Sequence, residues 1–226
     1  LEERVVVFAK DKPGLQDAHA YLKGHFSDVK LFRGRLDQPF PCVNNDFEPD
    51  ICISYLSPWV IPKYFLDRVK KFSINFHPGP PSYPGIGCTN FAIYHDEKQY
   101  GVTAHLMEEK VDSGKIIRVL RFPIGVDESV YSLSQMCYGF VQILFRQVFD
   151  FYIQNRALPA SDEKWKRKPY TWKDIHCLRR LELGMTEAEV KRRIRATAHH
   201  DWPGTYLEFS GERFVHQRVD SRPPVQ

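Results

Sequence analysis

Residues 73–85, SINFHPGPPSYPG, contain the stretch that decides the fold. Asn75 and His77 are two positions apart, so on a strand their side chains leave the same face. Phe76 then points the other way, into the core. Pro78 cannot continue a central strand, so the strand ends just after the imidazole. Because open α/β sheets place their chemistry at the carboxyl ends of parallel strands, we expect this segment to carry an amide and an imidazole to such an edge.

The segments around this strand follow an alternating pattern. Strands that alternate with helices indicate an α/β fold with a mainly parallel, twisted sheet and helices on its faces. A strand pair and a long helix with an apolar stripe at helical period complete the expected core. Apolar runs and periodicity predict strands at 5–8, 29–32, 51–56, 102–108 and 115–122, and helices at 15–26, 62–69, 88–96 and from 127 to about 153.

The composition becomes more polar after Asn155. Thr186 and Glu189 form a capping-box signature that predicts a helix to about residue 199. Two short strands at 206–209 and 213–216 would flank a turn and form a hairpin. We therefore expect a main domain at 1–156 and a small C-terminal α+β appendage at 157–226.

Asp112 precedes Ser113 and Gly114, a loop signal, and a turn could carry its carboxylate to the edge where Asn75 and His77 lie. An amide, an imidazole and a carboxylate together could bind an oxyanion, move a proton and orient the base. A histidine before a proline is also a common hydrogen-bonded turn residue, and aspartate is common in loops. The spacing alone therefore suggests catalysis without deciding it.

The composition narrows the class of protein. The chain has 226 residues, 42% hydrophobic and 27% charged, with a net charge of +4 and a pI near 8.7. This mild basicity suits an anionic substrate, and we expect no nucleic-acid partner. The five scattered cysteines form no Cys-x-x-Cys motif, so we expect reduced thiols, no metal site and a cytoplasmic location. No apolar run is long enough to span a membrane, and the charged first residues are unlike a signal peptide.

The motifs around this trio resemble those of the formyltransferases that use 10-formyltetrahydrofolate. Residues 73–85 resemble the Asn-x-His-Pro signature of that family, 53–62 its pterin-binding segment, and 100–107 with 111–117 its Gly-Val-Thr strand and Asp-x-Gly loop. The resemblance covers roughly residues 48–125. It implies a Rossmann-type core, 10-formyltetrahydrofolate as co-substrate, no metal, and Asn75, His77 and Asp112 as catalytic residues. It further implies a pterin pocket formed by Ser54, Tyr55, Leu56, Ile61, Met107, Glu108, Glu109, Lys110 and Val111.

The acceptor is less constrained. The proline-rich loop and short C-terminal part look most like bacterial nucleotide-sugar N-formyltransferases, including those acting on GDP-perosamine in lipopolysaccharide O-antigen synthesis. A tRNA enzyme would normally have a larger C-terminal barrel. Lys10, Lys12 and Arg35 are candidates to bind the diphosphate, and Tyr83 to touch the sugar.

Two alternatives stay open for the function. One is a ribonucleotide formyltransferase of the glycinamide type, although the first loop lacks a glycine-rich phosphate cradle. The other is a non-catalytic folate- or nucleotide-binding module. A homodimer is compatible with the sequence, and no membrane partner is expected.

Overall fold

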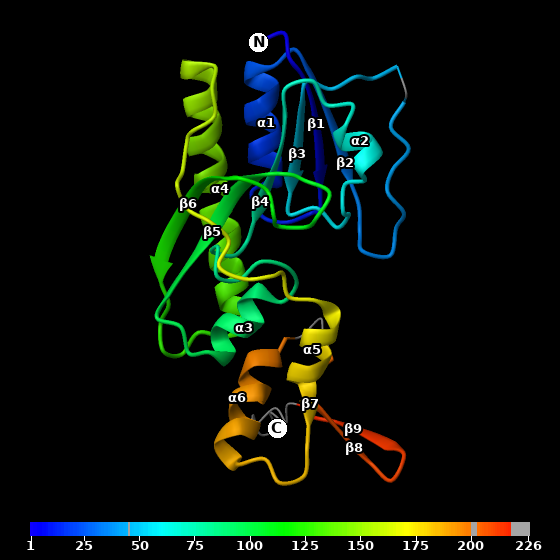
Figure 1. Ribbon diagram of the computed structural model, residues 1–226, viewed down its shortest axis with the longest axis vertical. Coiled ribbons are helices and arrows are strands. Elements are labelled where there is room, and N and C mark those ends of the chain that lie inside the picture. The colour runs from blue at the N-terminus through cyan, green and yellow to red at the C-terminus, as the bar shows by residue number, and fades with distance from the viewer. Residues whose placement is uncertain (45, 200–202, 218–226) are drawn as a thin grey trace, which may run out of the picture.

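The computed structural model describes residues 1–44, 46–199 and 203–217 (Figure 1). A larger part built on a six-stranded sheet is followed by a smaller part with its own three-stranded sheet. The elements are β1 (Arg4–Ala9), α1 (Leu15–His25), β2 (Asp28–Arg33), β3 (Ile51–Tyr55), α2 (Lys63–Leu66), β4 (Phe72–His77), α3 (Cys88–Tyr94), β5 (Gln99–Leu106), β6 (Ile116–Pro123), α4 (Val130–Asn155), α5 (Trp172–Arg179), β7 (Arg180–Leu181), α6 (Glu187–Thr197), β8 (Tyr206–Phe209) and β9 (Glu212–Val215).

The large sheet has the strand order β2-β1-β3-β4-β5-β6. The first four strands in this order are parallel, whereas β5 and β6 run antiparallel to their neighbours. The expected α/β fold with a mainly parallel sheet is therefore confirmed. The strand order reverses between β1 and β3, and such switch points are where open α/β sheets form their ligand crevices.

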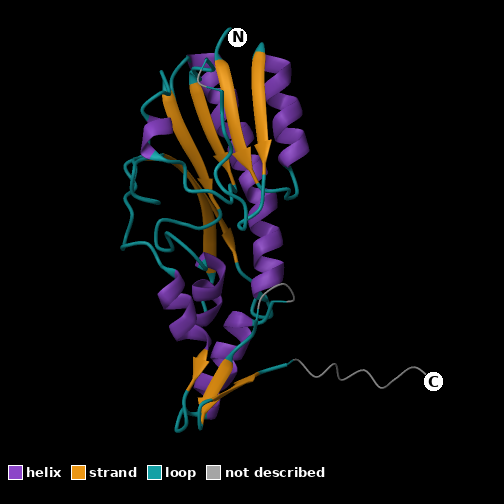
Figure 2. Ribbon diagram, turned by 90° about the vertical axis from the view of Figure 1, so that its right-hand side faces the viewer, coloured by secondary structure: helices purple, strands orange, loops and turns teal. Residues whose placement is uncertain are grey.

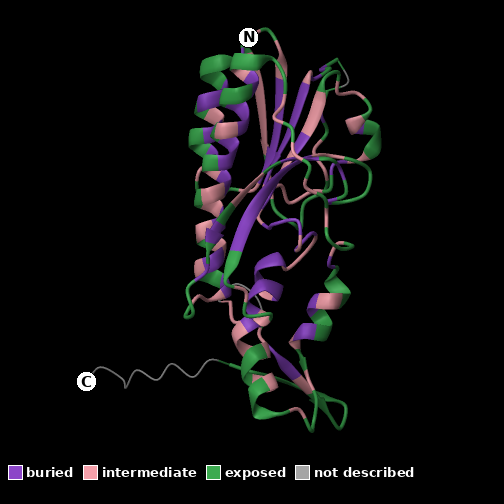
Figure 3. Ribbon diagram, turned by 60° about the vertical axis from the view of Figure 1, so that its left-hand side comes forward, coloured by how far each residue is buried: buried purple, intermediate pink, exposed green. Residues whose placement is uncertain are grey.

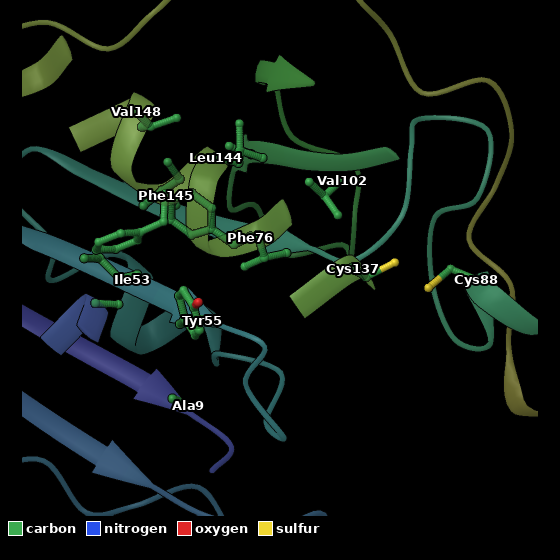
Figure 4. Close-up of a cluster of buried hydrophobic side chains, with 14 of the residues drawn as sticks. Ala9, Ile53, Tyr55, Phe76, Cys88, Val102, Cys137, Leu144, Phe145 and Val148 are labelled. Atoms are coloured by element: carbon green, nitrogen blue, oxygen red, sulfur yellow. The ribbon is translucent and has the colours of Figure 1, made fainter. Parts of the chain in front are cut away.

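Helices α1 and α4 cover one face of the sheet and share the larger hydrophobic core with it (Figures 1 and 2). Figure 4 shows Tyr55, Phe76 and Phe145 at the centre of this core. Phe76 is fully buried, as the alternation along β4 predicts. The opposite face carries a smaller apolar cluster, formed by Val6, Phe8, Val43, Phe47, Cys52, Ile61 and Phe65. Burial on both faces explains why β1 and β3 read as continuous apolar runs.

Helix α2 is shorter than the helix expected at 62–69. The backbone N–H groups of Lys70 and Lys71 bond to the carbonyl groups of Pro49 and Asp50 instead of continuing the helix. These bonds start the chain into β4 alongside β3. The expected helix is therefore correct over one turn only, because a tertiary backbone contact ends it.

The smaller part contains α5, α6 and the sheet β7-β8-β9 at the far end of the molecule from the N-terminus (Figure 1). The Thr186 cap is present, since its side chain accepts a hydrogen bond from the Glu189 N–H. The hairpin β8–β9 is also present and is mostly exposed (Figure 3). Helix α5 and strand β7 had no counterpart in the sequence analysis. The boundary at residue 156 stays a prediction, and residues 165–170 lie against the loop that follows β4.

None of the helices in the described part of the chain has the length and apolar character needed to cross a membrane.

Candidate functional site

The antiparallel pairing of β4 with β5 builds the centre of the site. Asn75 lies directly opposite His105 in this register, and His77 lies opposite Thr103. Asn75 Nδ2 is 3.0 Å from His105 Nε2 and donates to Asp112 Oδ1 over 3.3 Å. The three residues expected to act together are therefore adjacent, and a second imidazole, that of His105, has joined them.

The Asp112 carboxylate contacts each of the other three side chains of this group. Asp112 is buried, with 6% of its surface exposed, and has a positive φ of 45°, which aspartate tolerates better than most residues. Its Oδ2 accepts a hydrogen bond of 2.7 Å from the Gly85 N–H and lies 3.2 Å from His77 Nδ1. Its Oδ1 lies 3.2 Å from His105 Nε2. Burial opposes ionisation, but His77, His105 and the Gly85 N–H outweigh it and hold the pKa of Asp112 well below its usual value.

In both His77 and His105, the ring nitrogen that points away from Asp112 contacts a backbone carbonyl oxygen, and this contact shows which nitrogen carries hydrogen. His77 Nε2 lies 2.8 Å from the Tyr83 carbonyl oxygen, and His105 Nδ1 lies 2.7 Å from the Leu106 carbonyl oxygen. A carbonyl only accepts, so both of these nitrogens carry hydrogen. The Asn75 amide nitrogen only donates, so His105 Nε2 accepts from it. A second hydrogen on His77, at Nδ1 between the ring and the Asp112 carboxylate, would make this ring an imidazolium ion paired with the carboxylate.

Trp165 covers both imidazoles. Its ring centroid is 5.9 Å from that of His77 and 5.0 Å from that of His105, with edge-to-face geometry in both cases. Its Nε1 donates to the Gly114 carbonyl oxygen over 2.8 Å, which ties it to the loop that carries Asp112. The Trp165 ring limits the access of water to the polar group beneath it, and a low local dielectric strengthens hydrogen bonds there.

Sequence reasoning missed His105 and Trp165. His105 is detectable only once β5 is known to pair with β4, because the pairing places it opposite Asn75. Trp165 lies in a run with Lys164, Lys166 and Lys168, a pattern typical of a solvated basic surface. The lysines are exposed and the tryptophan is half-buried, so the aromatic residue is the anchor of that segment.

A substitution at Gly85 tests whether the close backbone contact with Tyr170 constrains the loop after β4. The φ of Gly85 is +87°, and a Cβ atom added there would meet the Tyr170 carbonyl oxygen at 2.3 Å. Gly85→Ala should therefore lower stability by more than the roughly 1–2 kcal/mol of a left-handed alanine, because the backbone of residue 170 must also move. The measurement is the midpoint of thermal unfolding.

Gly139→Ala is the matched control for Gly85→Ala. Gly139 lies within α4 with nothing within 4 Å of an added Cβ. Gly139→Ala should leave the free energy of unfolding unchanged or raise it by about 0.5–1 kcal/mol. Equal midpoints for Gly85→Ala and the wild type would show that the contact with Tyr170 does not constrain the loop.

A cavity of about 470 Å³ opens beside these residues. The residues that line it come from two sets of segments. The donor arm is mainly apolar and comprises residues of the segment after β3 and the loop after β5. The acceptor arm comprises residues from the end of β1, the loop after β4 and the helices α3, α4 and α5. The donor arm is lined by Ser54, Leu56, Ser57, Pro58, Trp59, Val60, Ile61, Leu66, Met107, Glu108, Lys110 and Val111, and the acceptor arm by Lys10, Lys12, Ile86, Gly87, Cys88, Tyr138 and Trp172.

Most of the residues expected to bind ligands line this cavity, and four do not. Tyr55 is fully buried and packs against Phe145 of α4, and Glu109 lies outside the lining. Arg35 is exposed and paired with Asp37. Tyr83 is 4% exposed, and its hydroxyl donates to Glu97 over 2.7 Å and lies 3.0 Å from His95 Nδ1. The proline-rich loop turns the Tyr83 side chain inward, so it supports the loop and does not reach the cavity.

Two cations distinguish the acceptor arm. Burial, with Lys12 nearby, lowers the pKa of Lys10. The ammonium group of Lys12 lies 5.4 Å from the centre of the Tyr138 ring. A bound anion would relieve the mutual repulsion of these lysines, so this arm suits a negatively charged ligand. Among the residues that the structure describes, no group of three or more His, Cys, Asp or Glu side chains could hold a metal ion.

Comparison with known proteins agrees with this geometry. A family model described as formyl transferase matches residues 33–147. The chain is 34% identical over 179 residues to GDP-perosamine N-formyltransferase of Brucella melitensis, a match that covers 77% of this chain and 67% of the relative. It is 25% identical over 187 residues to methionyl-tRNA formyltransferase of Myxococcus xanthus, covering 81% of this chain and 58% of that enzyme. The chain thus spans less than two thirds of the length of such methionyl-tRNA formyltransferases.

The fold is also shared with a solved structure. The crystal structure of an N-formyltransferase from Helicobacter canadensis, in complex with folinic acid and dTDP-3-aminofucose, matches with a TM-score of 0.72 at 18% identity. The match covers 92% of this chain and 85% of that one. At this identity the likeness concerns the fold alone.

Proposed function

Because the chain belongs to the formyl transferase family, we propose that it transfers a formyl group from 10-formyltetrahydrofolate to the amine of a nucleotide-linked amino sugar. The observation that carries this proposal is the convergence of Asn75, His77 and Asp112 on the wall of one cavity, whose lining also includes apolar side chains and two lysines. A donor and an acceptor could approach this wall from the two arms.

The donor arm has the chemistry that a pterin needs. A pterin is flat with a polar edge, so it fits a slot with apolar walls and backbone groups at its rim. Leu56, Ile61 and Met107 supply such walls, and the partly exposed Val111 also lines the cavity. The segments after β3 and β5 are irregular and can offer backbone N–H and C=O groups. A neighbour of the same fold was solved with folinic acid, which supports a folate donor here.

Asn75 and His77 would stabilise the charge that forms on the formyl oxygen during attack by the neutral amine. His77 Nε2 is engaged by the Tyr83 carbonyl oxygen, so Nδ1 is the ring nitrogen available to the substrate. Its contact with Asp112 is 3.2 Å long, which leaves room to share the hydrogen with a second acceptor. Preorganised donors of this kind usually contribute more to the rate enhancement than any other single effect.

Asp112 would hold the His77 imidazole in place and accept the proton that the attacking nitrogen loses, directly or through water. Its lowered pKa makes it a weak base, but the nitrogen becomes acidic once it is bonded to the formyl carbon. The carbon–nitrogen bond to the folate then breaks, and that nitrogen takes up a proton. The Gly85 N–H keeps the carboxylate oriented throughout.

For the acceptor, we propose a 4-amino-4,6-dideoxy sugar on a nucleoside diphosphate, with GDP-perosamine favoured. Lys10 and Lys12 line the arm where the diphosphate would lie. The 34% identity to a GDP-perosamine N-formyltransferase supports this sugar, and a neighbour of the same fold was solved with a dTDP sugar. The reaction would serve lipopolysaccharide O-antigen synthesis in the cytoplasm.

The decisive experiment compares three acceptors at equal concentration with 10-formyltetrahydrofolate: GDP-perosamine, dTDP-4-amino-4,6-dideoxyglucose and glycinamide ribonucleotide. We expect the highest kcat/KM for GDP-perosamine. A preference for glycinamide ribonucleotide would overturn the sugar proposal and leave formyl transfer standing. No turnover with any acceptor, in protein that binds folinic acid, would favour a non-catalytic folate-binding module.

A further inference from the structure

The acceptor arm contains an exposed aromatic side chain that the chemistry above does not use. Trp172 is the first residue of α5 and lines the same cavity as His77 and Lys12. Its exposed fraction is 45%, which is high for so large an apolar residue. A single exposed aromatic residue is common on protein surfaces, so its position and support decide what it does.

The backbone on both sides of Trp172 is rigidly held. Tyr170 stacks on Phe91 with ring centroids 3.6 Å apart, and the Arg167 guanidinium lies 3.3 Å from the centre of its ring. Its backbone exchanges hydrogen bonds of 2.9 Å with Pro84 and Ile86, on the active-site loop. Thr171 and Asp174 close a reciprocal cap on α5.

On the C-terminal side of Trp172, Ile175 packs closely on Gly87. A Cβ atom added at Gly87 would come within 2.0 Å of the Ile175 Cδ1. Helix α5 is thus fastened to the loop that also supplies the Gly85 N–H to Asp112. Trp172 is the residue between these anchors that faces the cavity, which makes it a preorganised apolar surface and not a mobile surface residue.

The cavity's other tryptophan has a different role. Trp59 packs against Phe8 and Phe40 and donates its Nε1–H to the Gln38 carbonyl oxygen. It belongs to the wall of the donor arm. The two tryptophans therefore lie on different arms, and the one on the acceptor arm comes from the C-terminal part of the chain.

We propose that Trp172 is the stacking surface for the nucleobase of the acceptor, with Lys10 and Lys12 binding the diphosphate between the base and the sugar. This inference rests on the proposed function and assigns a substrate contact to α5. The order of groups follows from the chemistry: the amine must reach Asn75 and His77, and the diphosphate follows towards the lysines. The flat base, at the end of the molecule, then meets the aromatic surface at the rim.

The test measures binding of GDP, dTDP, UDP and inorganic pyrophosphate by calorimetry to the wild type, Trp172→Ala and Trp172→Phe. Loss of base stacking should weaken the tightest-bound nucleoside diphosphate about tenfold or more in Trp172→Ala. Trp172→Phe should recover most of that loss, since a phenyl ring still stacks. Pyrophosphate, which has no base, should bind all three proteins equally. Phe214→Ala, which removes an exposed aromatic residue outside the cavity, is the control for nonspecific effects.

Formylation of the nucleotide sugar in the same preparations separates the two proposals. We expect Trp172→Ala to raise KM and leave kcat within about twofold, because a base contact far from the reacting atoms affects ground state and transition state alike. Unchanged nucleotide binding by Trp172→Ala, or no binding of any of the three by the wild type, overturns the stacking surface. Absence of formylation alongside a Trp172-dependent nucleotide affinity overturns the proposed reaction and leaves the stacking surface standing.

Discussion

His77→Ala should lower kcat for formyl transfer by at least about a hundred- to a thousandfold, the usual cost of removing one oxyanion donor. The imidazole is held from both sides, by the Tyr83 carbonyl oxygen at 2.8 Å and the Asp112 carboxylate at 3.2 Å, so its position is set before a substrate binds. Asn75→Ala should have an effect of the same order. The measurement is kcat at saturating donor and acceptor.

Two controls make this result interpretable. His176→Ala removes an exposed histidine of α5 and should leave kcat unchanged. Folinic acid should still raise the unfolding midpoint of His77→Ala, since the walls of the donor arm do not include the imidazole. A rate close to that of the wild type in His77→Ala would remove this histidine from the chemistry.

The sequence was sufficient to predict the strand that carries the site. The alternation of Asn75, Phe76 and His77 is a local property, and it correctly predicts which side chains point into the core and which towards the cavity. The turn signal after Asp112 is local as well. Both follow from strand geometry and turn chemistry, without knowledge of the rest of the fold.

The residues that were missed depend on contacts between distant segments. The β4–β5 register places His105 opposite Asn75, and the return of the chain past the loop that carries Asp112 brings Trp165 to the site. Tyr83 was expected at the substrate, but a stiff proline-rich loop does not reveal which way its side chains turn. Its buried contacts with His95 and Glu97 become apparent only in three dimensions. A sequence pattern predicts which residues share a face of a strand or helix. Contacts between distant segments, such as those of His105, Trp165 and Tyr83, are determined only when the chain folds.

Asp112→Asn should reduce kcat about a thousand- to ten-thousandfold, as expected when the carboxylate that orients a catalytic histidine becomes a neutral amide. The carboxylate accepts from Gly85 and Asn75 and faces two imidazole nitrogens. An asparagine has one acceptor oxygen, so its NH2 group must face a donor and lose at least one of these bonds. Asp127→Asn, at an exposed position, should leave the rate unchanged.

The stability of the same variant has a pH dependence whose sign follows from the lowered pKa of Asp112. A carboxyl group that ionises more readily in the folded state stabilises it at pH values above the ordinary aspartate pKa of about 4, and this contribution is lost as the pH falls below that value. Wild type should therefore be more stable than Asp112→Asn at pH 7, and the difference between their unfolding free energies should narrow in acid. Denaturant unfolding at pH 7 and at about pH 3 measures both values. A difference that stays constant or widens in acid would show that the folded protein does not stabilise the ionised carboxylate.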